Sequence, residues 1–593
     1  MSSEKDKRLQ SSLKTATGAF DQAVAVSQDA LNDGLYYLFD KYEDLQKMRV
    51  NSKKFGRIDA TMDHSEVSLP VKSSNYRTLV FYCMFQTGKL VLTDDDGNDK
   101  KPIDLAEWRF AFEVDYTTLD VPTNTAEHQE AKKQLNQPGD YSIKRLFLDF
   151  KTHKIRKFNQ DLSYFKNHKW DNEDLQSFLS LITFWGDPEH GVMKDKQKST
   201  LGYFLTTAKP ETVNPPAPTF PPTSMKHQHY KYIAPGKQTP DEGLKNGKNN
   251  MLLYLEMTQN RSFPSEDILE YSGNFVTPGM KGTTCISRDI FWDAYLLRSP
   301  SLSGPYGSQP PLLREFNRHV YAWLGEFHVW AKNYSTDFSW SYGFGHTRWE
   351  PSRSPDYFAW KKVSASKWQW KNHDHKKGHD EGIWPVRLDA KASSDTLNEL
   401  WFDPGSNKIH LKGCSKIWAE MKRSGFKNIE EKGGVAINWA LDITIDSVSE
   451  GGLKLNMNLP ANPKDIFHTS ALKEPFAFAE TQDEEPAKNE PAENELAESE
   501  LAENEPAENE PVENEFAETT PKTGKTGKIS VHDMTEAAND AASKLDFKSV
   551  TTNLQTALEN SARFVLPGGR QFFYNNAVFG NNGDLLVEAK YKS

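Results

Sequence analysis

Residues 435–445 read VAINWALDITI, and this stretch decides the fold. Every second residue in it is large and apolar: Val435, Ile437, Trp439, Leu441, Ile443 and Ile445. Because successive side chains of a strand point to opposite faces, this period of two predicts a β-strand with one buried face. Eleven residues at about 3.3 Å each span roughly 36 Å, which exceeds the usual strand of about five or six residues.

The same alternation appears elsewhere along the chain. Residues 108–116 read WRFAFEVDY and place Trp108, Phe110 and Phe112 on one face. Further strands are predicted at 58–69, 78–92, 141–150, 251–257, 320–330, 408–421 and 453–459, and a closing hairpin at 572–578 and 584–591. We therefore expect an α+β fold that is mainly antiparallel β.

An acidic cluster at residues 94–99 lies between two strand-like runs. It lacks the alternating ligands and the closing glutamate of an EF-hand calcium loop. The Asp96-Gly97 pair is instead a hairpin signal, so we expect a turn here.

Helices are predicted from apolar spacings near three, four and seven. Residues 8–47 read as an N-terminal amphipathic helix, and shorter helices are expected at 175–184, 286–297 and 531–561. The polar face of the N-terminal helix mixes Asp, Glu and Lys, unlike the basic face of a lipid-surface helix. We expect it to dock on its own protein.

The net charge of −11 is concentrated in one tract. Residues 483–518 hold fifteen acidic residues and one lysine, so the rest of the chain carries a net charge of +3. A nearly neutral body is unlike a protein that follows nucleic-acid phosphates, and we expect no nucleic-acid partner. Residues 484–518 are seven tandem pentads of the NEPAE type, whose charge and proline content predict a disordered insert.

These patterns divide the chain into six parts. The prediction is an N-terminal amphipathic helix at 1–48, a first β-rich module at 50–208, a Pro-rich connector at 209–249, a second β-rich module with a Trp/His-rich loop at 250–475, disordered acidic repeats at 476–528, and a C-terminal helix with a closing hairpin at 529–593.

Cysteine content and apolar runs bear on the compartment. Cys83, Cys285 and Cys414 are far apart and odd in number, which fits neither a disulfide framework nor a CxxC metal motif. The first ten residues contain no apolar signal segment, and no run of eighteen apolar residues occurs. We expect a cytoplasmic protein without a transmembrane segment.

Motifs of known catalytic chemistry are missing from the sequence. It contains no GxSxG, GxxxxGK[ST], HExxH or GxGxxG pattern, so no catalytic residue and no cofactor is predicted. Whether the protein is an enzyme stays open, with the balance toward a non-catalytic role.

Eight of the fifteen tryptophans fall between Trp323 and Trp384, beside a cluster of histidines. Three interpretations remain. The first is a hairpin loop with solvated polar residues. The second is a metal site in which His373, His375 and His379 meet a zinc ion, although neighbouring lysines oppose a cation. The third is a surface aromatic patch of Trp360, Trp368 and Trp370 that touches sugar or lipid head groups.

Several segments resemble a group of large, mostly uncharacterised fungal proteins. They are residues 251–259 (MLLYLEMTQ), 271–281, 285–298, 447–456, 564–570 and 579–592. More distantly, the chain resembles the tubular lipid-binding superfamily, which includes clostridial proteins encoded beside neurotoxin genes. That resemblance implies long curved sheets wrapped around long helices, with an apolar tunnel between them.

Three functions follow as hypotheses. The first is non-catalytic binding of a lipid or other hydrophobic small molecule in an apolar tunnel, with Trp108, Phe110, Phe112, Trp439 and Leu441 as lining residues. The second is an enzyme or accessory protein of a fungal secondary-metabolite pathway that acts on a hydrophobic intermediate. The third is a toxin-like protein that engages membranes or glycans, with peripheral membrane contact.

Overall fold

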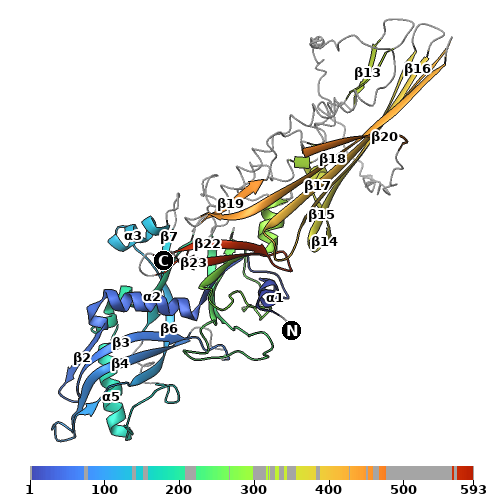
Figure 1. Ribbon diagram of the computed structural model, residues 1–593. Coiled ribbons are helices and arrows are strands. Elements are labelled where there is room, and N and C mark those ends of the chain that lie inside the picture. Colours follow the sequence, from blue (N-terminus) through green and yellow to red (C-terminus); the bar gives the residue numbers. More distant parts are fainter. Residues whose placement is uncertain are drawn as a thin grey trace, which may run out of the picture.

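The computed structural model describes residues 3–72, 78–135, 142–150, 158–206, 222–258, 260–265, 268–297, 316–317, 320, 328–332, 339–343, 355–381, 387–425, 428–448, 452–457, 466–475, 564–566 and 570–591. The strand pairs within these residues are antiparallel, which confirms a mainly antiparallel β fold. The strands form a larger sheet of fourteen strands and a second sheet of seven strands, which lie toward opposite ends of an elongated molecule (Figure 1).

The larger sheet has fourteen strands. The predicted closing hairpin is confirmed, and it places the end of the chain between strands of the first half. The strand order is β2 (Lys47–Ser52), β3 (Gly56–Ser68), β4 (Thr78–Leu92), β6 (Arg109–Asp120), β7 (Ser142–Asp149), β8 (Thr200–Thr206), β21 (Phe564–Leu566), β22 (Arg570–Phe579), β23 (Leu585–Tyr591), β11 (Gly282–Ile286), β1 (Gln22–Ser27), β10 (Met251–Thr258) and β9 (Pro222–Tyr230), with β5 (Ile103–Asp104) beside β4.

The expected turn at residues 94–99 is confirmed. The Gly97 amide donates to the Asp94 carbonyl (3.0 Å), and the Asn98 amide donates to the Asp94 carboxylate (2.7 Å). Gly97 has a φ of +84°, which a residue without Cβ adopts readily.

Two helices cover one face of the larger sheet. In α2 (Gln28–Lys41) the Ser27 hydroxyl caps the Ala30 amide (3.1 Å), and in α5 (Asn172–Trp185) the Asp171 carboxylate caps the Asp174 amide (2.7 Å). Their apolar faces join one core with β3, β4, β6 and β7. The helix predicted at 175–184 is thereby confirmed.

The N-terminal helix predicted at residues 8–47 is wrong in most of its extent. The chain forms α1 (Glu4–Leu9), then β1, then α2. β1 is buried on both faces, with Val24 and Val26 in the core beside α2 and Ala23 and Ala25 in another core. Small and β-branched residues suit a strand between two cores, and the helix-like spacing came from joining β1 with α2.

The second sheet has seven strands, several of which are long, and we call it the long sheet. Its order is β14 (Lys361–Ser364), β15 (Lys367–Glu381), β16 (Arg387–Phe402), β17 (Lys408–Ser424), β18 (Ile429–Val448) and β19 (Gly452–Met457), with β20 (Phe467–Leu472) also paired to β18. The strand predicted from residues 435–445 is confirmed as the centre of β18, whose 20 residues span roughly 66 Å. A separate hairpin pairs β12 (His328–Lys332) with β13 (Ser339–Gly343).

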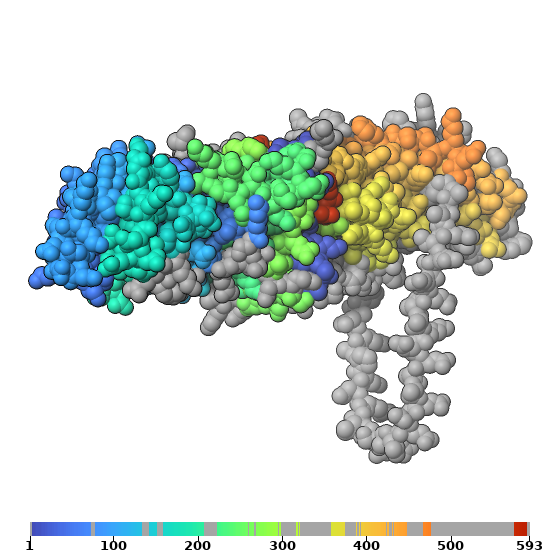
Figure 2. Space-filling model, turned by 90° about the horizontal axis from the view of Figure 1, so that it is seen from below, coloured from blue at the N-terminus to red at the C-terminus, as the bar shows by residue number. Residues whose placement is uncertain are grey.

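The turn between β22 and β23 connects the two sheets. The buried Asp584 carboxylate accepts the amides of Leu13 (2.9 Å) and Arg288 (2.8 Å). On the other side, Gly405 donates to the Phe579 carbonyl (2.8 Å), which ties the turn to the loop between β16 and β17. The colours in Figure 2 accordingly run from blue and cyan at one end, through green, to yellow and orange at the other.

Long helices are not found among the described residues, which corrects that part of the expected fold. Besides α1, α2 and α5, these residues form α3 (Ala126–Leu135), the π-helical η5 (Asp289–Leu296) and the 3₁₀ turns η1 (Glu43–Leu45), η2 (Val192–Lys194), η3 (Lys196–Ser199) and η8 (Pro355–Phe358). None of the described helices is both long and apolar enough to cross a membrane. The acidic repeats and the helix predicted at 531–561 lie outside the described residues.

The Pro-rich connector predicted at 209–249 is also corrected in part. Residues 222–230 form β9, an edge strand that pairs only with β10 in the described sheet. Pro222 is its first residue, where the missing N–H removes no bond from a strand interior. Residues 209–221 lie outside the described part of the chain.

Candidate ligand-binding face

One face of the long sheet is apolar across four strands. Strand register aligns Trp368, Leu400, Leu411 and Leu441 in one row across the sheet, and Ile409 pairs with Ile443 in the next. These side chains and their neighbours along β18 are at most 4% exposed and belong to a single core. The predicted lining residues Trp439 and Leu441 lie on this face.

The end of this face near β22 is closed by stacked aromatic rings. The Trp292 ring of η5 stacks on Trp368 at 4.6 Å and on Phe402 at 5.3 Å between ring centroids. Its indole N–H donates to the Gly583 carbonyl (3.0 Å), so one side chain joins η5, the β22–β23 turn and the long sheet. The helix predicted at 286–297 is confirmed as η5, in π-helical form.

The surface aromatic patch predicted for Trp360, Trp368 and Trp370 is wrong. The three side chains are 8%, 1% and 2% exposed, and all belong to the core of the long sheet. Along β15, Trp368 and Trp370 alternate with residues that are more exposed, so the two tryptophan rings share the inward face. Alternating tryptophans here serve sheet packing.

The histidine cluster lies in a strand, which corrects the expected hairpin loop. β15 continues through Gly378, which pairs with Ala390, to Glu381. His375 and His379 are therefore separated by four extended residues, about 13 Å, and cannot share an ion with His373 as a returning loop would allow. The side chains of His375 and His379 lie outside the described residues, and the described residues contain no group able to hold a metal.

A band of polar side chains crosses the middle of the apolar face. It consists of Asn372 on β15, Ser394, Thr396 and Asn398 on β16, and Ser415 on β17, each at most 1% exposed. Register places Asn372 opposite Thr396 and Thr396 opposite Ser415, while Asn398 lies opposite Trp370 and Gly413. We call this set the polar band.

The polar band is only partly satisfied by hydrogen bonds. The Thr396 and Ser415 hydroxyls bond to each other (2.7 Å), and the Tyr357 hydroxyl donates to Asn372 Oδ1. Among the described residues, no hydrogen-bond partner reaches Asn372 Nδ2, Ser394 Oγ or Asn398 Oδ1. Buried polar atoms are paired in the great majority of cases, so three in one band call for an explanation.

A glycine gives the polar band its room. A Cβ at Gly413 would lie 2.1 Å from the Trp439 ring and 2.3 Å from Asn398 Oδ1. Any larger residue would therefore displace the Trp439 ring or the Asn398 side chain. The bare backbone at Gly413 allows an indole and an amide to occupy the same part of the sheet surface.

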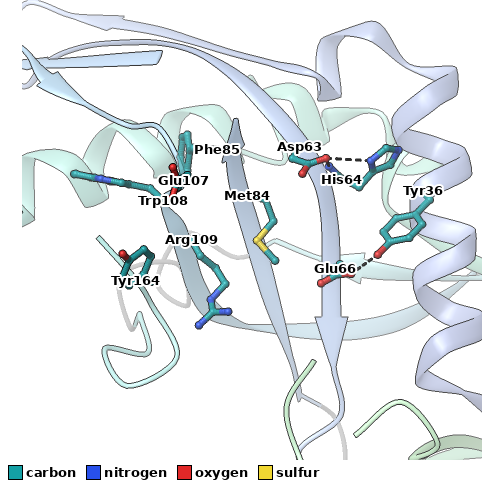
Figure 3. Close-up of a pocket in the computed structure, with 10 residues that line it drawn as sticks. All are labelled: Tyr36, Asp63, His64, Glu66, Met84, Phe85, Glu107, Trp108, Arg109 and Tyr164. Atoms are coloured by element: carbon teal, nitrogen blue, oxygen red, sulfur yellow. Dashed lines mark hydrogen bonds and ion pairs between the residues drawn. The ribbon is translucent and has the colours of Figure 1, made fainter. Parts of the chain in front are cut away.

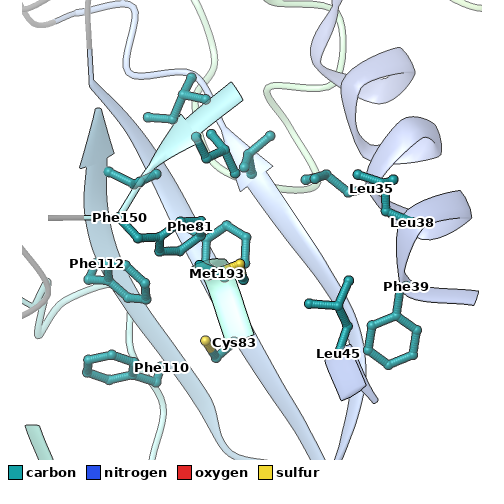
Figure 4. Close-up of a cluster of buried hydrophobic side chains, with 14 of the residues drawn as sticks. Leu35, Leu38, Phe39, Leu45, Phe81, Cys83, Phe110, Phe112, Phe150 and Met193 are labelled. Atoms are coloured by element: carbon teal, nitrogen blue, oxygen red, sulfur yellow. The ribbon is translucent and has the colours of Figure 1, made fainter. Parts of the chain in front are cut away.

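The first half of the chain contains the other predicted lining residues. Trp108, Phe110 and Phe112 are at most 1% exposed and lie in the core that α2 and α5 complete. Figure 4 shows Phe110 and Phe112 beside Phe81, Cys83 and Phe150 in this core. The cavity between α2, β4 and β7 measures about 20 Å³, room for about one water molecule. The protein's own side chains thus fill this face.

A polar groove of about 610 Å³ lies between α2, β3, β4 and β6 (Figure 3). His64 is held between the carboxylates of Asp40 (3.0 Å) and Asp63 (3.2 Å), and the Tyr36 hydroxyl donates to Glu66. Burial, and then the neighbouring Glu66, raise the pKa of Tyr36. The groove gathers titratable side chains, but many of them pair with one another.

Sequence patterns did not reveal the polar band. Its strands β15 and β16 were not predicted, because the histidine cluster suggested a loop and residues 387–402 mix polar and apolar types. A usable signal was the run Trp368, Trp370, Asn372, in which an amide follows two tryptophans at the same parity.

Neither a protein-family model nor a curated protein matches this chain. Among solved structures, P47 of Clostridium botulinum E1 aligns at 10% sequence identity and a TM-score of 0.41, covering 97% of this chain and 99% of that chain. A lipopolysaccharide binding protein aligns at 9% identity and a TM-score of 0.28, again covering 97% and 99%. Because both TM-scores are below 0.5, neither likeness assigns a function, and the resemblance to fungal proteins stays a prediction.

Proposed function

We propose that the protein binds a lipid or another hydrophobic small molecule on the apolar face of β15–β18, without changing it chemically. The observation that carries the proposal is the polar band, whose buried polar atoms lack described partners in the middle of an apolar face. An amphiphile supplies both an apolar chain for the rows around the band and a polar group for the band itself.

The three polar-band atoms without described partners are costly to leave unbonded. A buried donor or acceptor without a hydrogen bond costs about 1–3 kcal/mol, so a band used only for packing would be a standing loss of stability. A guest that bonds to these atoms removes that loss and buries its own chain at about 25 cal/mol per Å². Both terms favour an occupied face.

The two alternative functions find less support in the geometry. An enzyme at this face would need converging titratable groups, whereas the described side chains of the polar band are amides and hydroxyls. Membrane or glycan contact through Trp360, Trp368 and Trp370 would need these rings at the surface, and they are buried.

The test is native mass spectrometry of the purified full-length protein before and after extraction with organic solvent. We expect an additional mass of a few hundred daltons that disappears on extraction and returns when the protein is incubated with a cell lipid extract. A protein of bare polypeptide mass that acquires no lipid from the extract would refute the proposed function.

A further inference from the structure

We infer that the polar band selects a guest whose head group is uncharged and both donates and accepts a hydrogen bond, as a primary amide does. This inference rests on the proposed function and adds the chemical class of the guest. It follows from which atoms of the band are already bonded, which are left over, and which charges are near them.

A chain of hydrogen bonds fixes the orientation of Asn398. The Phe358 carbonyl can only accept, so the Asn317 group that bonds to it (3.0 Å) is the amide nitrogen. Asn317 Oδ1 then faces Asn398 and accepts from Asn398 Nδ2 (2.8 Å). The remaining atom, Asn398 Oδ1, is therefore an acceptor that requires a donor.

The other two atoms supply the complementary chemistry. With Asn372 Oδ1 bonded to the Tyr357 hydroxyl, Asn372 Nδ2 is a donor that requires an acceptor. Ser394 Oγ can act in either sense. Asn372 and Asn398 are diagonal neighbours across β15 and β16, at about 7–8 Å between main chains, so one small head group can reach both.

The described side chains of the polar band offer no counter-ion to an ionic head group. The described side chains of the polar band are neutral, and burying an ion without a partner is far more costly than burying an amide. The backbone register does place Asp374 opposite Ser394, so a cationic head group is the charged alternative that an experiment must include.

The experiment is a competition for the delipidated full-length protein, read by native mass spectrometry. The probes are three sixteen-carbon compounds that differ in the head: hexadecanamide, hexadecane and hexadecylamine. The wild type should bind hexadecanamide with about tenfold higher affinity than hexadecane, which is the effect of satisfying one to two buried hydrogen-bonding atoms. The amine should be held less well than the amide.

Variants of the polar band test which residues produce the preference for the amide over the alkane. Asn398→Leu should bind hexadecane as before and lose most of the tenfold preference, and the smaller change Ser394→Ala should reduce it. Asn438→Leu is the matched control, because Asn438 is an exposed asparagine on the other face of β18 and should keep the wild-type preference.

The outcomes separate the two proposals. Equal binding of amide and alkane by the wild type, or a preference for the amine, overturns the inference and leaves hydrophobic binding intact. A preference that survives in both Asn398→Leu and Ser394→Ala overturns the role of the polar band. Binding of none of the three probes contradicts the proposed function itself.

Discussion

Replacing Glu256 with glutamine should stabilise the protein by several kcal/mol above pH 8 and change little at pH 4.5. Glu256 is a β10 residue that is 3% exposed and faces Gln22 on β1 and Met225 on β9. No described residue bonds to its Oε2 atom. Burial alone raises the pKa of this carboxyl group from 4.5 to about 8.

The direction of the pH effect follows from proton binding. Between pH 4.5 and 8 the folded state keeps the Glu256 proton, whereas the unfolded state loses it, so wild-type stability falls as pH rises. Over that interval the loss is on the order of 4 kcal/mol, at about 1.4 kcal/mol for each pH unit. Glutamine has the shape of the neutral acid and does not titrate, so Glu256→Gln escapes this loss.

The measurement is the denaturant midpoint of wild type and variant from pH 4.5 to 9. Burial also raises the pKa values of Asp21 and Asp584, so only the difference between the two proteins isolates Glu256. Glu113→Gln, at an exposed strand position on β6, is the control and should follow the wild type. A Glu256→Gln curve parallel to that of the wild type at all pH values would show that the carboxyl group is not buried in neutral form.

Replacing Trp292 with alanine should lower the free energy of unfolding by about 4 kcal/mol. The indole is fully buried, stacks on Trp368 and Phe402, and donates to the Gly583 carbonyl. Its removal leaves a cavity among aromatic rings and an unbonded carbonyl in the turn that connects the two sheets. Both effects act on the same junction.

A matched tryptophan tests this account of the junction. Trp401 lies on the other face of β16, is partly exposed and stacks on His410 at 5.1 Å. Trp401→Ala should cost about 1 kcal/mol or less, because little apolar area returns to water. Denaturant midpoints of both variants, with near-ultraviolet circular dichroism as a check on folding, provide the comparison. Equal losses would mean that Trp292 is not a central contact.

Strands with one apolar face were predictable from the sequence, and strands between two cores were not. Residues 435–445 alternate strictly, because β18 has a buried face and a more exposed one, and the strand was found at its place. β1 is buried on both faces, so its residues show no alternation of polar and apolar types. Its Ala and Val residues merged with the apolar residues of α2 into one apparent helix.

The candidate site was predictable only in its apolar part. Trp439 and Leu441 were found because their strand was found, whereas Asn372 and Asn398 lie on strands that the sequence did not reveal. Asn317 approaches Asn398 from 81 positions away in the chain, and only the fold brings such residues together. Polar atoms that the core leaves unbonded can be recognised only when all the neighbours are known.

The most direct test of hydrophobic binding at the long sheet is photocrosslinking with a sixteen-carbon alkyl diazirine that carries a terminal amide. After irradiation and digestion, peptides of β15–β18 should carry the probe, and excess hexadecanamide should remove the label. Labelling that is absent from these strands, or confined to the polar groove beside Tyr36 and Arg109, would contradict a guest on this face.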